Sequence, residues 1–126
     1  MAPGRPSALQ SVGRGGEAVA ARLLEAEGYR ILARNYRCPA GEVDLVAQEG
    51  DCLVFVEVRT RNGDLYGTPE ESVTARKQAR LVQVAGAYLA EQEDWEGDWR
   101  IDVVAIDMAP GGRVRRLEII RNAVSA

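Results

Sequence analysis

The chain contains no histidine, and this absence excludes more kinds of function than any other feature of its composition. Without an imidazole there is no Ser-His-Asp or Cys-His nucleophile system, no HExxH zinc site and no imidazole base. Catalysis would have to rely on carboxylates, arginine, tyrosine, the single lysine Lys77 or a metal ion. Ligation by oxygen alone favours a hard cation such as Mg²⁺ or Mn²⁺ over zinc or copper.

Cysteine is scarce, and long apolar runs are absent. Cys38 and Cys52 are the two cysteines and lack CxxC spacing, which argues against a disulfide framework and against a zinc ribbon. No apolar run approaches the roughly 20 residues that span a bilayer, and the N-terminus lacks the apolar segment of a signal peptide. We therefore expect a cytoplasmic protein.

The length of 126 residues fits one domain with a real core. Apolar residues make up 46% of the chain and charged residues 28%, a balance that excludes general disorder. Residues 1–12 contain proline and glycine without any periodicity, so we expect a flexible tail there and a single domain over residues 13–126.

The net charge of −3 argues mildly against a nucleic-acid partner, because such proteins usually carry a basic surface. The distribution of charge weakens this objection. Residues 1–40 and residues 111–126 each carry +3, and much of the negative charge falls within residues 91–98. Basic ends and a remote acidic loop leave room for one positive face.

Hydrophobic periodicity predicts the order helix, three strands, helix, two strands. The predicted helices cover residues 14–27 and about 70–91, and the predicted strands cover residues 29–36, 42–48, 52–60, 100–108 and 113–120. The second helix is expected to start near the capping box Thr68-Pro69-Glu70-Glu71, with Gly67 and Ser72 leaving its first residue open. This order predicts an α/β fold whose helices pack on a mixed five-stranded sheet.

Two acidic residues, Asp44 and Glu57, lie inside apolar predicted strands with twelve residues between them. A buried carboxylate without a partner is costly, so such a group is normally neutralised, paired with a cation or bound to a metal. The two strands form a hairpin, and both carboxylates can face the same side near one end. Glu17 can approach from the apolar side of the first helix. These three acids predict a magnesium site, and Arg59 on the same strand face could grip a phosphate.

A structural role explains the same acids. Asp44 and Glu57 could instead belong to a salt-bridge network with basic residues, namely Arg59, Arg61, Arg100 or Lys77. Asp102, which lies in an apolar strand beside Arg100, is expected to be a structural partner rather than a metal ligand. The residues alone leave both interpretations of the Asp44–Glu57 pair open.

Two stretches are distinctive, Gly41-Glu42-Val43-Asp44-Leu45-Val46 and Phe55-Val56-Glu57-Val58-Arg59-Thr60-Arg61. With the rest of roughly residues 12–107, they resemble the YraN family. Members of that family are regarded as endonucleases of the PD-(D/E)XK superfamily, similar to archaeal Holliday-junction resolvases. The resemblance implies a restriction-endonuclease-like core and DNA as the partner. It leaves a homodimer open, because resolvases act as symmetric dimers.

The resemblance also implies roles for individual residues. Asp44 and Glu57 would bind Mg²⁺ or Mn²⁺ with help from the carbonyl of Val58, and Glu17 would complete the acidic cluster. Arg59 takes the place of the motif lysine. Because arginine stays protonated, it can stabilise charge but cannot accept a proton from the attacking water.

Activation of that water would then fall to the metal or to Lys77. The catalytic set implied by the resemblance is Glu17, Asp44, Glu57 and Arg59, and the basic residues expected to contact DNA are Arg14, Arg34, Arg61 and Lys77.

Two functions follow as hypotheses. The first is a magnesium-dependent endonuclease that hydrolyses phosphodiester bonds in DNA, with branched or otherwise structured DNA as a candidate substrate. The alternative is a non-catalytic DNA or nucleoprotein binding module that keeps a nuclease fold. A purely structural interaction domain, with its acids paired to arginine, is a third interpretation.

Overall fold

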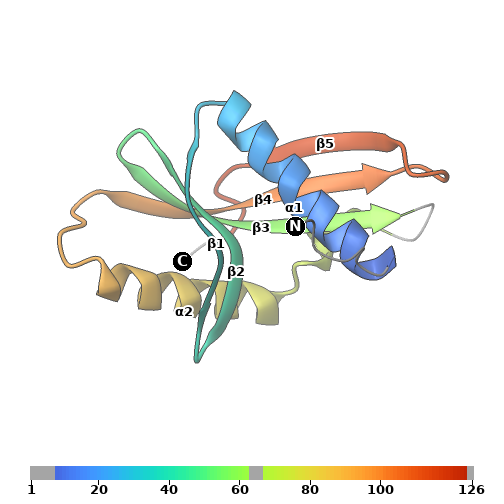
Figure 1. The fold of residues 1–126 in the computed structure, drawn as a ribbon. Helices are drawn as coiled ribbons and strands as arrows, with labels where there is room; N and C mark the ends of the chain where they lie inside the picture. The colour runs from blue at the N-terminus through green and yellow to red at the C-terminus, as the bar shows by residue number, and fades with distance from the viewer. Residues whose placement is uncertain (1–7, 63–66, 125–126) are drawn as a thin grey trace, which may run out of the picture.

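The computed structural model describes residues 8–62 and 67–124, with side chains from residue 15 onward. Its elements are α1 (Ala8–Ala26), β1 (Arg30–Cys38), β2 (Gly41–Glu49), β3 (Cys52–Asn62), the 3-10 turn η1 (Glu70–Ser72), α2 (Ala75–Glu91), β4 (Asp98–Met108) and β5 (Val114–Ile120). Figure 1 shows α1 and α2 on opposite faces of the sheet. The predicted α/β class and the predicted order of helices and strands are confirmed.

The five strands form one mixed sheet in the order β1-β2-β3-β4-β5. The pairs β1–β2, β2–β3 and β4–β5 are antiparallel, whereas β3 and β4 are parallel and are connected through α2. A parallel pair needs such a long crossover, because its second strand must start at the same end of the sheet as the first. The predicted central position of residues 52–60 is confirmed, since β3 is the middle strand.

The central strand is apolar on both faces because each face is covered by one helix. Phe55 points to the side where α2 packs and lies in one core with Val84, while Val56 points the other way and lies in a second core with Leu24 of α1. All four side chains are fully buried. Burial of a side chain of this size contributes about 1.5–3 kcal/mol, so the two cores hold the sheet between its helices.

Both helices start at residues other than those expected. The first begins at Ala8, six residues before the expected start and within the segment expected to be a flexible tail; residues 1–7 lie outside the described residues. Neither described helix is both long and apolar enough to cross a membrane.

The second helix begins later than the capping box suggested. The Oγ1 atom of Thr68 accepts the N–H of Glu71 at 3.3 Å and donates to its carboxylate at 3.1 Å. The threonine half of the box therefore forms, but it encloses only the short turn η1. Thr74 then caps α2 by accepting the N–H of Lys77 at 3.3 Å. Lys77 consequently lies in the first turn of α2.

A buried polar network ties the chain together around Asp102, which is fully buried. Its carboxylate accepts hydrogen bonds from the hydroxyl of Tyr29 at 2.9 Å, Nε of Arg100 at 3.0 Å and the N–H of Asn122 at 2.8 Å. Burial and the neighbouring carboxylate raise the pKa of Tyr29 to about 12. Asp102 is therefore the structural partner of Arg100 that the sequence predicted.

Candidate functional site

The two acids singled out by the sequence meet across β2 and β3. Leu45 is paired with Val56, so the next residues along the two strands, Asp44 and Glu57, lie opposite each other. Their side chains share a hydrogen bond. One oxygen of Asp44 also accepts the N–H of Val58 at 2.7 Å. The backbone of the central strand thus fixes one carboxylate, and that carboxylate holds the other.

Burial raises the pKa of both carboxyl groups. For Asp44 the main cause is burial, opposed by the hydrogen bond from Val58. For Glu57 burial again acts first and the negative charge of Asp44 adds to it, so that its pKa rises to about 8. Near pH 7 the pair therefore holds a proton between its oxygens. A cation bound there would replace this proton.

Glu57→Gln is expected to stabilise the metal-free protein at alkaline pH. A carboxyl whose folded pKa is raised from 4.5 to about 8 stabilises the fold below pH 4.5, and this contribution is lost as the pH rises towards and through 8. The amide has no proton to lose. At pH 8.5 the free energy of unfolding of the variant should therefore exceed that of wild type by at least about 1 kcal/mol. Urea unfolding in EDTA from pH 5 to 9 measures this difference, and a constant difference across that range would contradict it.

Glu17 approaches the pair but does not join it. Its side chain is half-buried on α1 and hydrogen-bonds to the side chain of Asn35, and its pKa is raised by burial and then by the charge of Asp44. Asn35 has a φ of 54° within β1, a left-handed conformation that asparagine tolerates better than most residues. Sequence reasoning gave Asn35 no role.

The expected cluster of three carboxylates is thus not assembled as a finished cage. Among residues 15–62 and 67–124, no group of three or more Asp, Glu, Cys or His side chains is arranged to hold a metal ion. The physical reason is that Asp44 and Glu57 bond to each other while Glu17 bonds to Asn35. The donor set nevertheless suits Mg²⁺ or Mn²⁺, since two half-buried carboxyl groups, which supply oxygen ligands, are held together although one of them retains a proton.

Arg59, expected to grip a phosphate, is held from two sides. Its Nε donates to the hydroxyl of Ser72 at 2.8 Å, and its guanidinium lies 3.7 Å from the carboxylate of Glu57. The turn that carries Ser72 is in turn anchored to β5 by the ion pair of Glu70 with Arg116 at 2.7 Å. Arg59 is therefore fixed beside the carboxylate pair, with part of its guanidinium free of these contacts.

The four basic residues expected to contact DNA lie in different surroundings. Arg34 is exposed on β1 and its charge acts on Glu17, while Lys77 is half-buried and its charge acts on Glu57. Arg61 is half-buried and donates to the carbonyl of Thr68 at 3.4 Å, so it faces the loop before η1 rather than an open surface. The side chain of Arg14 lies outside the described side chains.

A cavity of about 230 Å³ opens directly beside the carboxylate pair. Residues from the start of β2, from β3 and from the first half of α2 line it: Gly41, Glu42, Glu57, Lys77, Arg80 and Leu81. Arg80 was missed by the sequence reasoning. The available signal was its position three residues after Lys77, which places both side chains on one face of a helix.

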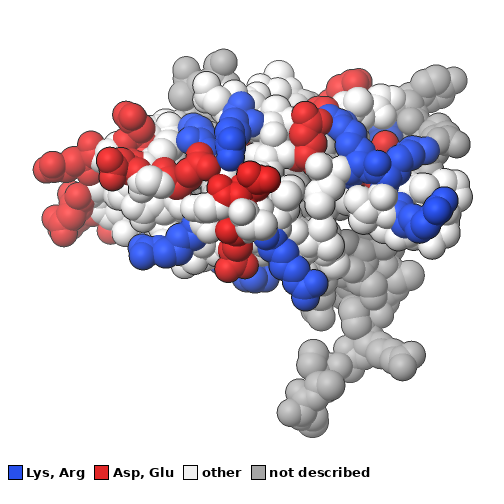
Figure 2. Space-filling model, turned by 90° about the horizontal axis from the view of Figure 1, so that it is seen from above, with Lys and Arg blue, Asp and Glu red and all other residues white. Residues whose placement is uncertain are grey.

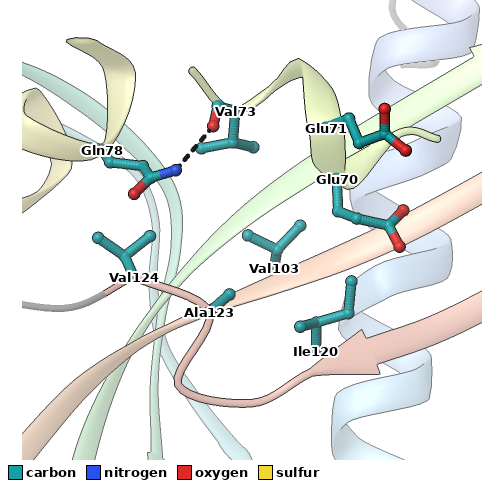
Figure 3. Close-up of a pocket in the computed structure, with 8 residues that line it drawn as sticks. All are labelled: Glu70, Glu71, Val73, Gln78, Val103, Ile120, Ala123 and Val124. Carbon is teal, nitrogen blue, oxygen red and sulfur yellow. Dashed lines mark hydrogen bonds between the residues drawn. The ribbon is translucent and has the colours of Figure 1, made fainter. Parts of the chain in front are cut away.

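A larger cavity of about 510 Å³ lies on the same side of the sheet, between η1, α2 and the end of β5 (Figure 3). Its polar groups are engaged internally, because Glu70 forms two hydrogen bonds with Arg116 and the amide of Gln78 donates to the carbonyl of Val73 at 3.0 Å. The remaining lining is mainly apolar, as Figure 3 shows. The smaller cavity is therefore the stronger candidate for a functional site.

Acidic side chains gather at the end of the molecule away from the pair. Figure 2 shows them at the left end of the molecule, which is the end where Figure 1 places the β2–β3 turn and the α2–β4 loop. Cys52 at the start of β3 is paired with Asp98 of β4. Glu57 lies five residues further along β3, about 17 Å away at 3.3 Å per residue. The acidic loop is thus remote from the carboxylate pair, as the charge distribution in the sequence suggested.

Two solved structures align with most of this chain at low sequence identity. The Holliday junction resolvase Hjc of Archaeoglobus fulgidus is 18% identical, with 87% of this chain and 88% of that chain covered and a TM-score of 0.46. EndoMS in complex with double-stranded DNA is also 18% identical, with 78% and 38% covered and a TM-score of 0.41. Such distant likenesses carry no chemistry from one chain to the other.

Sequence relatives are much closer. A UPF0102 protein of Symbiobacterium thermophilum is 52% identical, with 91% of this chain and 97% of that protein covered. Another, from Pelotomaculum thermopropionicum, is 50% identical, with 92% and 97% covered. The model of the uncharacterised protein family UPF0102 matches residues 16–106, a range that contains Glu17, Asp44 and Glu57. The chain therefore belongs to the UPF0102 family, the family of YraN.

Proposed function

We propose that this chain is a metal-dependent endonuclease of the PD-(D/E)XK type that hydrolyses phosphodiester bonds in DNA. The observation that carries the proposal is the pair Asp44–Glu57: two half-buried carboxylates side by side on adjacent strands, with a basic residue on either side of Glu57. Structural ion pairs match each acid with a base. Here Glu57 has a basic neighbour, Arg59 at 3.7 Å, but it also hydrogen-bonds to a second acid, Asp44. Two acids bonded to each other are typical of sites that bind a cation.

Asp44 and Glu57 would hold Mg²⁺ or Mn²⁺, with the carbonyl of Val58 as a further ligand. The bound ion would polarise a water for attack and neutralise charge on the phosphate. Glu17 lies close enough to act on the pair electrostatically and would orient water at its edge. Arg59, fixed by Ser72, would stabilise negative charge on the scissile phosphate without exchanging a proton.

The test uses the wild-type chain with linear duplex, nicked, forked and four-way-junction DNA. Cleavage is expected in Mg²⁺ or Mn²⁺ and not in EDTA, with the junction and fork arms deciding whether structured DNA is preferred. If every DNA substrate remains intact in every reaction that contains Mg²⁺ or Mn²⁺, the proposal is wrong. Light scattering on the same preparations measures whether the chain is the homodimer that the resemblance leaves open.

The second candidate is a non-catalytic DNA or nucleoprotein binding module, and one observation favours it. Arginine stands at position 59, where the related motif carries lysine, and its Nε is engaged with Ser72. A chain of this kind would bind DNA equally well in EDTA and in Mg²⁺ and would leave it uncut. Either function fits the expected cytoplasmic location.

A further inference from the structure

We infer that the cavity between the β1–β2 turn and α2 is a phosphate subsite, in which Lys77 and Arg80 hold a phosphate of the nucleic acid beside the carboxylate pair. The inference rests on the proposed function for the identity of the ligand. It adds Arg80 to the binding residues and gives Lys77 a defined place in the site.

The two cations line one cavity from one helix. Lys77 and Arg80 are three residues apart on α2, so their side chains project from the same face. Within residues 15–62 and 67–124, Arg80 makes no hydrogen bond or ion pair, and the charge of Lys77 acts on Glu57. Two cations in a half-enclosed cavity, one of them unpaired, suit an anionic group with several acceptor oxygens.

The position of Arg80 is built into the fold at Gly41. A side chain at residue 41 would begin 2.9 Å from Cδ of Arg80 and 3.6 Å from a methyl of Val84. Gly41 also has a φ of 143°, which other residues rarely adopt. The bare backbone of this turn therefore lets the aliphatic part of Arg80 lie against it, at the edge of the cavity that Arg80 lines. Figure 1 shows this end of the hairpin reaching α2.

Two acids, Glu42 and Glu57, also line the cavity, but each has a basic partner or a proposed cation that reduces its repulsion of a phosphate. Glu42 is paired with Arg37 at 2.8 Å. The carboxylate of Glu57 lies 3.7 Å from the guanidinium of Arg59, and in the proposed enzyme it would bind the cation. A phosphate could then lie between the metal site and the two bases. That position would align the DNA strand with Arg59 on the other side of Glu57.

The test is the salt dependence of DNA binding in EDTA, measured by fluorescence anisotropy on a duplex and on a four-way junction. Loss of one phosphate contact lowers the slope of log K against log salt by about 0.9, which corresponds to roughly eightfold weaker binding at 0.1 M salt. Arg80→Gln is expected to show both changes. Arg80→Lys, which keeps the charge, should keep the slope.

Arg30→Gln is the matched control, because Arg30 is exposed at the other end of β1, about 26 Å along the strand from the cavity. Arg80→Gln binding no more weakly than Arg30→Gln would overturn the subsite. Duplexes with a 5′-phosphate or a 5′-hydroxyl identify the phosphate: dependence on Arg80 in both assigns an internal phosphodiester, and dependence in the first alone assigns a terminal phosphate. Either result supports the subsite.

The subsite and the nuclease can fail separately. Cleavage by the wild-type chain, together with binding that is independent of Arg80, would overturn the subsite and leave the nuclease. DNA binding that depends on Arg80, without cleavage in any metal, would support the subsite and overturn the nuclease.

Discussion

Asp44→Asn is expected to lower DNA cleavage by at least about a thousandfold. The carboxylate is one of two half-buried ligands of the proposed metal site. Metal-ion stabilisation of the transition state is worth several kcal/mol, and each 1.36 kcal/mol corresponds to a factor of ten in rate. Asparagine can still accept the N–H of Val58, now 2.7 Å from the Asp44 carboxylate, so the strand pairing should be retained. Initial rates in saturating Mn²⁺ measure the loss.

The matched control is Asp51→Asn, which removes the same charge from the exposed β2–β3 turn. Its rate should stay within about twofold of wild type, because exposed charges interact weakly across screened solvent. Equal rates for wild type and Asp44→Asn would remove the carboxylate pair from the reaction. A loss of unfolding free energy in Asp44→Asn would instead assign the pair a structural role.

Asp102→Ala is expected to cost about 3–5 kcal/mol of unfolding free energy, a large share of the stability of a domain of this size. The substitution leaves the hydroxyl of Tyr29, the guanidinium of Arg100 and the N–H of Asn122 without their common acceptor. Arg100 would keep Glu49, 2.7 Å away, as its remaining carboxylate partner. Urea unfolding at pH 7 measures the change.

Asp107→Ala provides the comparison on the same strand. Asp107 is less buried and pairs with Arg115 at 3.2 Å near the surface, so its removal should cost less than about 1 kcal/mol. Similar costs for the two substitutions would show that the Asp102 network does not hold the fold. Asp102→Ala lies outside the proposed site, so any surviving folded protein should still bind Mn²⁺.

The fold was predictable because its helices and strands carry clear hydrophobic patterns. The double-sided apolar run around Phe55 and Val56 identified the central strand, since only a strand covered on both faces has such a run. The start of α2 was less predictable. Ser72 looks like part of a helix in the sequence, but its hydroxyl bonds to Arg59, thirteen residues earlier in the chain, and such tertiary contacts override local capping signals.

The site was predictable at its centre and not at its edges. Asp44 and Glu57 stood out because carboxylates are rare in buried strands, and the register of one hairpin was enough to place them together. Glu17 hydrogen-bonds to Asn35, whose left-handed conformation in β1 is not revealed by local sequence patterns. In the sequence Arg80 cannot be distinguished from other surface arginines. Only the fold brings the turn at Gly41 against it.

The central claim is that Asp44 and Glu57 form a metal site, and a Mn²⁺ titration by calorimetry tests it most directly. Wild type should bind the ion and release close to one proton near pH 7, because the pKa of Glu57 is raised to about 8 and the ion replaces the shared proton. Asp44→Asn and Glu57→Gln should each weaken binding at least tenfold. Binding of Mn²⁺ with the same affinity by wild type and both variants would contradict the account.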